Sequence, residues 1–176
     1  MMQKWMVMAF ALYALSACTG VPKGVEPVAS VDTKRYLGTW YEIARLDHSF
    51  ERGLQQVTAT YTENPDGSIK VINTGYDPVK KNWKSAEGKA LFINNENNDH
   101  TRTGRLKVSF FGPFYSSYNI IDLDINYQYA VICGPNKSYF WIVSRTPTMD
   151  KNQIKQLVEK AKSQGFKTEQ LIYVSH

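Results

Sequence analysis

The stretch Gly38-Thr39-Trp40-Tyr41-Glu42-Ile43-Ala44-Arg45 has the pattern of a β-strand that begins at a sharp turn. Glycine lets the backbone turn or approach another segment closely, and the aromatic and β-branched residues that follow suit a pleated surface. Because side chains alternate along a strand, Trp40, Glu42 and Ala44 are expected on one face. A tryptophan at the start of such a strand can close the end of a β-barrel, although a core tryptophan in a β-sandwich has the same pattern.

Seven further strands are expected after this one, separated by turn signals rich in Asn, Asp, Gly and Pro. Their expected ranges are 54–63, 68–76, 83–93, 105–111, 115–123, 127–133 and 139–145. Within the fourth strand, Gly88 is expected to mark a bulge or bend. Strands at hairpin spacing predict an up-and-down antiparallel meander. Closing it into an eight-stranded barrel removes its exposed edges.

The periodicity changes after the eighth strand. Residues 150–165 carry apolar side chains at helical spacing, with Asp150 as the expected N-cap and Gly165 just past the end. A short last strand is expected at 171–174, and Asp32 could cap a helical turn before the first strand. The predicted fold is therefore an all-β, eight-stranded barrel with one C-terminal helix packed outside it and a short final strand.

The first 17 residues have the composition of a secretory signal peptide. Lys4 precedes the apolar segment 5–15, which is too short to span a bilayer comfortably. The apolar segment ends in Leu15-Ser16-Ala17-Cys18, which resembles a bacterial lipobox at all four positions. The resemblance implies that Cys18 becomes the acylated first residue of the mature protein; the alternative is an ordinary signal peptide with a chance cysteine. Several acyl chains together would anchor it stably.

The residues that follow Cys18 complete the expected domain organisation. Thr19 favours the outer membrane, since an aspartate there would suggest retention in the inner membrane. Residues 18–30, rich in small residues, Gly and Pro, are expected to form a flexible lipidated tether. Residues 31–176 are expected to form a single barrel domain.

The charge of the chain argues against a nucleic-acid partner. The formal net charge is +5 over 176 residues, and the basic residues form no long run. A nucleic-acid-binding face would normally cluster them along one helix or surface. We interpret the charge as weak attraction to anionic surfaces, of which membrane headgroups are the leading candidate.

Three motifs together resemble those of the lipocalin family. The first is Gly38-Thr39-Trp40, and the third is Ser144-Arg145-Thr146-Pro147 at the end of the eighth strand. The second, Asp124-Ile125-Asn126-Tyr127-Gln128-Tyr129, matches only in part because the usual Thr-Asp-Tyr is missing. The resemblance extends from about residue 34 to residue 174 and includes the late helix.

This resemblance implies a structural role for Gly38, Trp40 and Arg145 at the closed end of the barrel. There the guanidinium would cover the indole face and bind carbonyl groups left free by closure. If Arg145 faces inward, side-chain alternation predicts the ligand-lining residues of the eighth strand. These are Tyr139, Trp141 and Val143, with Phe140 and Ile142 facing outward under the helix.

Other lining candidates come from strands whose phase the sequence does not determine. They are Ile72, Phe92, Phe110 and Tyr118. Glu42 shares the face of Trp40 and is open to three interpretations. It could anchor a polar head group, be a buried acid with a raised pKa, or form a salt bridge with a neighbouring Lys or Arg.

The resemblance implies a binding protein without a cofactor. It would store or transport fatty acids (palmitate among them) or lysophospholipids at the outer membrane, for envelope maintenance under stress. The domain would face the periplasm, and a homodimer is possible. An apolar barrel interior suits an acyl chain, since each buried methylene contributes about 0.8 kcal/mol.

Two alternatives remain open, an enzyme of the isomerase or synthase type and a haem or pigment carrier. The sequence contains no Gly-x-Ser-x-Gly elbow and no phosphate loop. Cys133 is the one thiol besides Cys18, and it is expected to be a small buried apolar residue. His48, His100 and His176 lack metal-ligand spacing, so each is expected in solvent and no metal site is predicted.

Overall fold

The computed structural model describes residues 19–94 and 96–176, and among them nine strands form one antiparallel sheet. The strand order is β2-β3-β4-β5-β6-β7-β8-β1-β9, and β1 also pairs with β2, which closes eight strands into a barrel. The strands are β1 (Gly38–Arg45), β2 (Gln55–Glu63), β3 (Ile69–Asp77), β4 (Asn82–Phe92), β5 (Arg105–Phe111), β6 (Phe114–Leu123), β7 (Tyr129–Cys133), β8 (Phe140–Ser144) and β9 (Ile172–Tyr173). The predicted barrel is confirmed.

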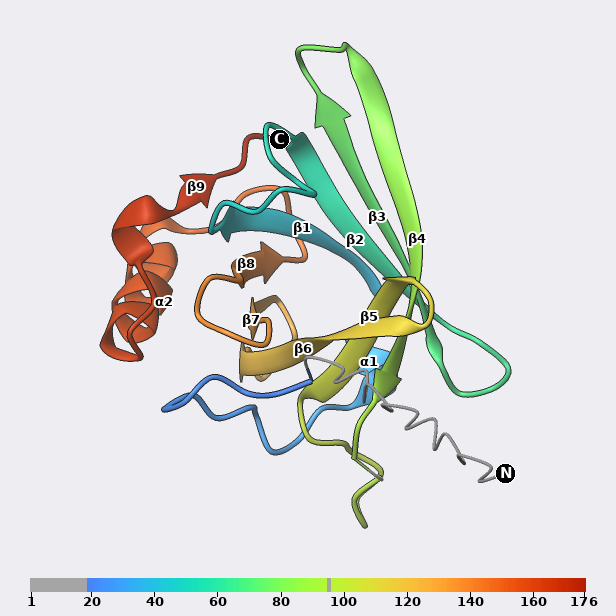
Figure 1. The fold of residues 1–176 in the computed structure, drawn as a ribbon. Helices are drawn as coiled ribbons and strands as arrows, with labels where there is room; N and C mark the ends of the chain where they lie inside the picture. The colour runs from blue at the N-terminus through green and yellow to red at the C-terminus, as the bar shows by residue number, and fades with distance from the viewer. Residues whose placement is uncertain (1–18, 95) are drawn as a thin grey trace, which may run out of the picture.

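The helices are α1 (Thr33–Tyr36), α2 (Lys151–Ser163) and the short 3₁₀ helix η1 (Thr168–Gln170). Asp32 caps α1 by accepting from the backbone N–H of Arg35 at 3.1 Å, and Asp150 caps α2 in the same way. Figure 1 shows α2 outside the barrel, with β9 beside the end of β1. Among the described residues, no helix is long and apolar enough to cross a membrane.

Side chains from the sheet form two apolar clusters, one on each side of it. The interior cluster fills the closed half of the barrel and consists of Val31, Tyr36, Trp40, Tyr61, Ile69, Val71, Ala90, Leu106, Ile120, Tyr127, Ala130, Ile132 and Val143. The outer cluster lies between the sheet and α2 and consists of Val25, Ile43, Ala44, Leu46, Ile121, Val131, Cys133, Phe140, Ile142, Leu157, Ala161 and Phe166. Burial on both sides explains why β7 and the first four residues of β8 are apolar.

A β-bulge in β1 divides that strand between the two clusters. The register with β8 shifts between Glu42, which pairs with Val143, and Ala44, which pairs with Ile142. Ile43 and Ala44 both belong to the outer cluster, so Arg45 returns to the inward face.

The predicted bulge at Gly88 is wrong. Gly88 pairs with Val71 inside an unbroken β3–β4 register. A Cβ at this position would lie 2.8 Å from the Phe110 ring and 2.7 Å from the carbonyl oxygen of Ser109. The glycine is therefore needed because β5 approaches the backbone of β4 closely.

The predicted flexible tether is also wrong for residues 19–30, which pack against the barrel. Ser117 Oγ donates to the Gly20 carbonyl at 2.6 Å, and Val25 is buried in the outer cluster. The backbone N–H of Val28 donates to the Ile120 carbonyl at 2.9 Å. Small residues and proline suit this close packing as well as they suit a free linker. The predicted signal peptide and Cys18 lie outside the described residues.

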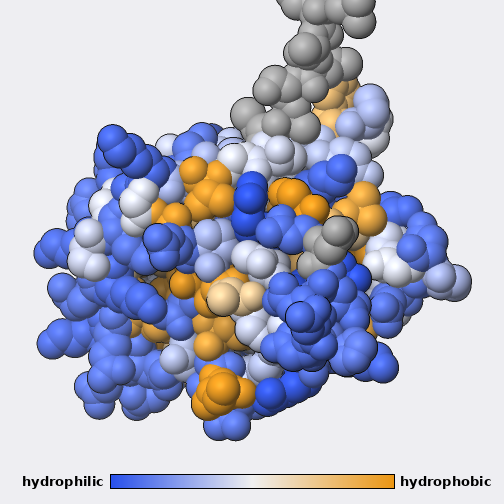
Figure 2. All heavy atoms as spheres, turned by 90° about the horizontal axis from the view of Figure 1, so that it is seen from below, coloured by the Kyte–Doolittle hydropathy of each residue, from blue (hydrophilic) through white to orange (hydrophobic). Residues whose placement is uncertain are grey.

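The surface of the molecule carries both hydrophilic and apolar side chains. Figure 2, viewed from below Figure 1, shows a mainly hydrophilic face with apolar side chains gathered in patches toward its middle. Around the open end, the loops between β1 and β2 and between β3 and β4, together with the adjoining ends of β5 and β6, expose large apolar side chains. These include Phe50, Val79, Phe111 and, at the β5–β6 turn, Phe114.

Candidate functional site

Trp40 and Arg145 close one end of the barrel, which we call the floor. The Cζ atom of Arg145 lies 3.9 Å from the centroid of the Trp40 ring, so the predicted stacking is present. Trp40 is fully buried, and its Nε1 donates to the Tyr36 carbonyl at 2.8 Å. The Arg145 guanidinium donates to three backbone carbonyls, those of Arg35 (2.6 Å), Thr39 (3.1 Å) and Tyr127 (3.3 Å).

Gly38 and Tyr127 complete the floor. Gly38 has φ +95°, a backbone conformation that strains other residues, and a Cβ there would crowd Arg145 Nη1 at 3.2 Å. Tyr127 accepts from the backbone N–H of Asp32 at 2.8 Å through its hydroxyl, and the Arg35 guanidinium lies 4.1 Å above its ring. The partial second motif therefore supplies a floor residue that sequence reasoning did not single out.

The inward phase of β8 follows the sequence prediction. Val143 belongs to the interior cluster and Trp141 packs against it, whereas Phe140 and Ile142 lie in the outer cluster. The Phe140 ring is 4.8 Å from the Phe166 ring beyond the end of α2. Tyr139 precedes the strand, and its ring lies stacked 6.3 Å from that of Trp141.

Three more of the expected lining residues also face inward. Phe92, Phe110 and Tyr118 pack against the interior cluster, and each retains part of its accessible surface. Ile72 does not join them. Val71 takes the inward position of β3, so Ile72 lies on the opposite face, paired with Thr60. The expected inward placement of Ile72 is wrong because the odd-numbered residues Ile69 and Val71 are the ones that face inward on β3.

At the open end, Arg45 joins the barrel wall to the loop between β1 and β2. The residue is 1 % exposed. Its Nη1 donates to Glu42 Oε1 at 2.6 Å, and its Nη2 donates to the carbonyls of Glu51 (3.0 Å) and Leu54 (3.1 Å). The guanidinium therefore holds the loop against the inward face of β1.

Glu51 is the second carboxylate of this buried group. Its Oε2 accepts from Trp141 Nε1 at 3.1 Å and lies 3.1 Å from His48 Nε2. The His48 ring stacks on Phe50, with centroids 4.1 Å apart, and lies 5.0 Å from the Trp141 ring. We call Glu42, Arg45, His48, Glu51 and Trp141 the rim network.

The rim network holds the carboxylates of Glu42 and Glu51 near the Arg45 guanidinium. The pKa values of the two carboxyl groups shift in opposite directions. Burial, together with the nearby charge of Glu51, raises the pKa of Glu42 to about 8 against the opposing effect of Arg45. Burial also acts to raise the pKa of Glu51, but the His48 and Trp141 contacts outweigh it and the net direction is downward. Two of the interpretations of Glu42 thus hold together: it pairs with Arg45, and it is a buried acid with a raised pKa.

One further inward polar group has no partner among the described residues. The Oδ1 atom of Asn73 on β3 is buried without a hydrogen bond. Asn73 pairs with Ala59 on β2 and Ala86 on β4, and Ala59 in turn pairs with Trp40. It therefore shares the inward face of these strands.

The comparison with known protein families decides the classification. The family described as lipocalin-like domain matches residues 31–176. The chain belongs to the lipocalin family. Two bacterial relatives are named outer membrane lipoprotein Blc: that of Vibrio cholerae is 52% identical over 161 residues, 91% of either chain. That of Escherichia coli K12 is 50% identical over 166 residues, covering 94% of this chain and 90% of the relative.

More distant relatives agree with this classification. Temperature-induced lipocalin-1 of Arabidopsis thaliana is 36% identical over 152 residues, covering 82% of this chain and 78% of the relative. Among solved structures, insecticyanin from Manduca sexta has a TM-score of 0.68 at 20% identity, covering 89% of this chain and 87% of that one, which supports the fold alone. Both bacterial relatives are thus named as outer membrane lipoproteins.

Each of the three histidines was expected in solvent, and the structure differs from this expectation for one of them. His48 is 5 % exposed within the rim network, so the prediction of a solvated loop residue is wrong for it. His100 is exposed and pairs with Glu96 at 2.7 Å. His176 donates from Nε2 to the Glu42 carbonyl at 2.8 Å. In the part of the chain that the structure describes, no three potential ligands gather to hold a metal ion.

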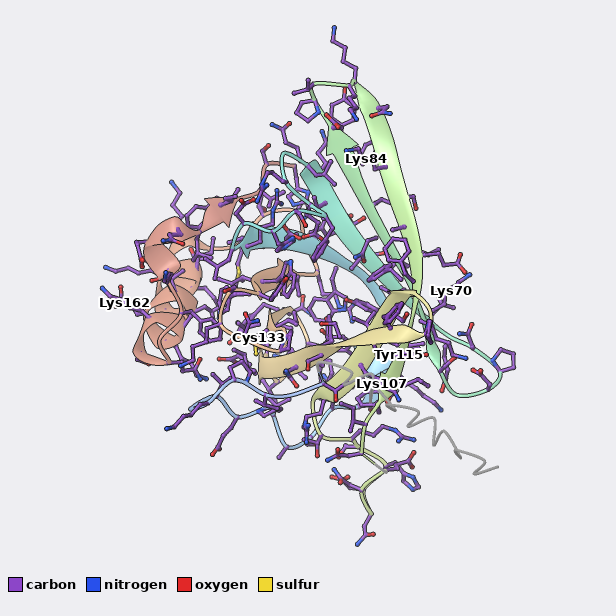
Figure 3. The ribbon with its side chains drawn as sticks, viewed as in Figure 1. Lys70, Lys84, Lys107, Tyr115, Cys133 and Lys162 are labelled. Atoms are coloured by element: carbon purple, nitrogen blue, oxygen red, sulfur yellow. The ribbon has the colours of Figure 1, made fainter. Side chains whose placement is uncertain are left out.

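Cys133 lies on the outer side of the lipocalin barrel, in the cluster under α2 (Figure 3). It is fully buried, and burial raises the pKa of its thiol to about 12. A thiol of this kind is protonated at neutral pH and separated from the interior by the sheet. Cys133 is therefore not placed to act as a nucleophile on a ligand inside the barrel.

Proposed function

We propose that this lipocalin binds one amphiphilic lipid, a fatty acid or a lysophospholipid, with its acyl chain inside the barrel. The observation that supports this best is the inward wall itself. Phe92, Phe110 and Trp141 face the interior and keep accessible surface although they pack against the interior cluster. Apolar side chains that remain accessible inside a closed sheet are stabilised by contact with an apolar ligand.

The energetics favour a ligand that buries several methylenes. Each methylene removed from water contributes about 0.8 kcal/mol, so a few methylenes contribute as much as one good hydrogen bond with a charged partner. At the open end, the rim network places charged and polar groups beside Trp141. A ligand with an apolar chain and one polar end matches this gradient from apolar wall to polar rim.

The second part of the proposal concerns the anchor. Cleavage after residue 17 and acylation of Cys18 would attach the protein to the outer membrane, with the domain on the periplasmic side. Support comes from the full lipobox match and from the relatives named outer membrane lipoproteins. A carrier held at a lipid surface is suited to store or transport lipids during envelope maintenance under stress. Pairing of two copies is a further expectation, to be checked by sedimentation.

The direct test is native mass spectrometry of the purified protein, followed by extraction and identification of lipids. We expect one lipid per barrel. Calorimetric titration with a long-chain fatty acid then compares Trp141→Ala with Phe140→Ala. Loss of inward apolar contact in Trp141→Ala should weaken binding by roughly 1–3 kcal/mol, about 5- to 150-fold.

Phe140→Ala is the matched control, because this neighbouring ring faces the outer cluster. It should lower stability and leave the affinity of the folded protein nearly unchanged. A reversed pattern, or a barrel that neither carries nor binds any lipid, would contradict the proposal.

A further inference from the structure

Three tyrosine hydroxyls from separate elements meet inside the barrel, directly above the floor. Tyr36 belongs to α1, Tyr61 to β2 and Tyr118 to β6. The oxygens of Tyr36 and Tyr118 are 2.6 Å apart, and Tyr61 donates to Tyr118 at 3.0 Å. The Tyr36 ring also packs against the Trp40 ring, with centroids 5.0 Å apart. We call these residues the tyrosine triad.

Counting protons shows that the triad has one donor too many. Three hydroxyls carry three protons, but they form two hydrogen bonds with one another, and no other acceptor contacts them in the described part of the chain. Burial raises the pKa of each hydroxyl, that of Tyr61 to about 12, so all three protons are present at neutral pH. One O–H group therefore lacks a partner.

Burial decides which hydroxyl carries the spare proton. If Tyr118 donated to Tyr36, the spare proton would lie on Tyr36, which is 2 % exposed and cannot reach water. An unsatisfied buried donor is costly. If Tyr36 donates instead, Tyr118 accepts two hydrogen bonds and keeps its own proton free. Tyr118 is the member of the triad with more accessible surface, so this arrangement is favoured.

Tyr118 faces the inside of the barrel. Tyr118 pairs with Leu106 on β5, which pairs with Phe92 on β4, and all three are inward. Two donors that point at one hydroxyl oxygen polarise it and strengthen its own O–H as a donor. The wall thus presents a strong donor among apolar side chains, low in the barrel.

We propose that Tyr118 is the hydrogen-bond donor of a polar subsite deep in the barrel, which receives an acceptor oxygen of the ligand. The ligand class is an amphiphile that has a carboxyl, hydroxyl or carbonyl oxygen on the part that enters deepest. This assignment rests on the proposed lipid-binding function and adds a chemical requirement to it. A chain that ends in a methyl group at this depth leaves the donor unsatisfied.

The test is calorimetric titration of the purified protein with 12-hydroxydodecanoic acid, which carries an oxygen at both ends. One oxygen then reaches the triad in either orientation of the chain. Tyr118→Phe keeps the ring and removes the donor, and it should weaken binding about five- to tenfold, the loss of one hydrogen bond. Tyr61→Phe leaves the Tyr118 hydroxyl in place and should weaken binding less.

Tyr115→Phe is the matched control on the same strand. Its ring faces outward, 4.9 Å from Lys107 Nζ, and both residues are labelled in Figure 3. It should leave the affinity unchanged, and thermal unfolding verifies that every variant is folded. Equal affinity of Tyr118→Phe and wild type would overturn the subsite alone. A wild-type protein that binds neither this acid nor dodecanoic acid would overturn the proposed lipid binding and the subsite with it.

Discussion

Replacing Arg145 with alanine removes the contacts that hold the floor closed. Three carbonyl groups lose their donor, at about 1 kcal/mol each, and the Trp40 face loses a cation worth about 1 kcal/mol. Because Arg145 is only half-buried, water can reach some of the carbonyls and offsets part of this loss. We therefore expect the free energy of unfolding to fall by about 2–4 kcal/mol.

Urea denaturation followed by circular dichroism measures this loss, and thermal unfolding should show a decrease of about 5 to 15 °C in Tm. Arg145→Lys keeps the charge but cannot reach three carbonyls while lying flat on an indole, so its stability should be intermediate. Arg52→Ala removes an exposed guanidinium that pairs with Asp47, and it should leave the midpoint unchanged. A wild-type midpoint in Arg145→Ala, or full rescue by lysine, would refute this account of the floor.

Three further predictions follow from the rim network, the anchor and the floor. The raised pKa of Glu42 means that the folded protein keeps a proton that the unfolded chain releases above about pH 4.5, so stability should decrease as the pH rises from 4.5 to about 8. Glu42→Gln should flatten this decrease, which is measured by urea denaturation at a series of pH values. If the free energy of unfolding of Glu42→Gln falls with pH as steeply as that of the wild type, the assigned role of Glu42 is wrong. Cys18→Ser should release the protein from the outer membrane in cell fractionation, which continued membrane association would disprove. Gly38→Ala should destabilise the fold, as φ +95° strains an L-residue and the new Cβ crowds Arg145, and a stable Gly38→Ala variant would count against that crowding.

The sequence was sufficient to predict the floor and the two faces of β8. The floor followed from the resemblance of Gly38, Trp40 and Arg145 to the lipocalin motifs, and the faces of β8 followed from the rule that side chains alternate along a strand. Once Arg145 was placed inward, Val143 and Trp141 followed, and Phe140 was left for the outer cluster. The strand boundaries deviate by only a residue or two, because turn residues bound each strand closely.

Other features depend on packing between distant segments, which no local pattern reveals. Ile72 and Val71 are both β-branched, and only their cross-strand partners determine which one faces inward. His48 looks like an ordinary loop residue until the loop folds back over Glu51 and the Trp141 ring. The tyrosine triad joins residues 36, 61 and 118, so it appears only once α1 is docked under the barrel.

The bulge in β1 connects the floor and the rim, since this one strand supplies Trp40 at its start and Arg45 at its end. With regular alternation from Trp40, Arg45 would point outward into the apolar cluster under α2. There its guanidinium would be a buried cation far from Glu42, which is strongly unfavourable. The bulge instead turns Ile43 and Ala44 together toward α2 and returns Arg45 to the interior. A single extra residue in β1 therefore allows the strand to serve the outer cluster without losing the charged group that holds the loop over the open end.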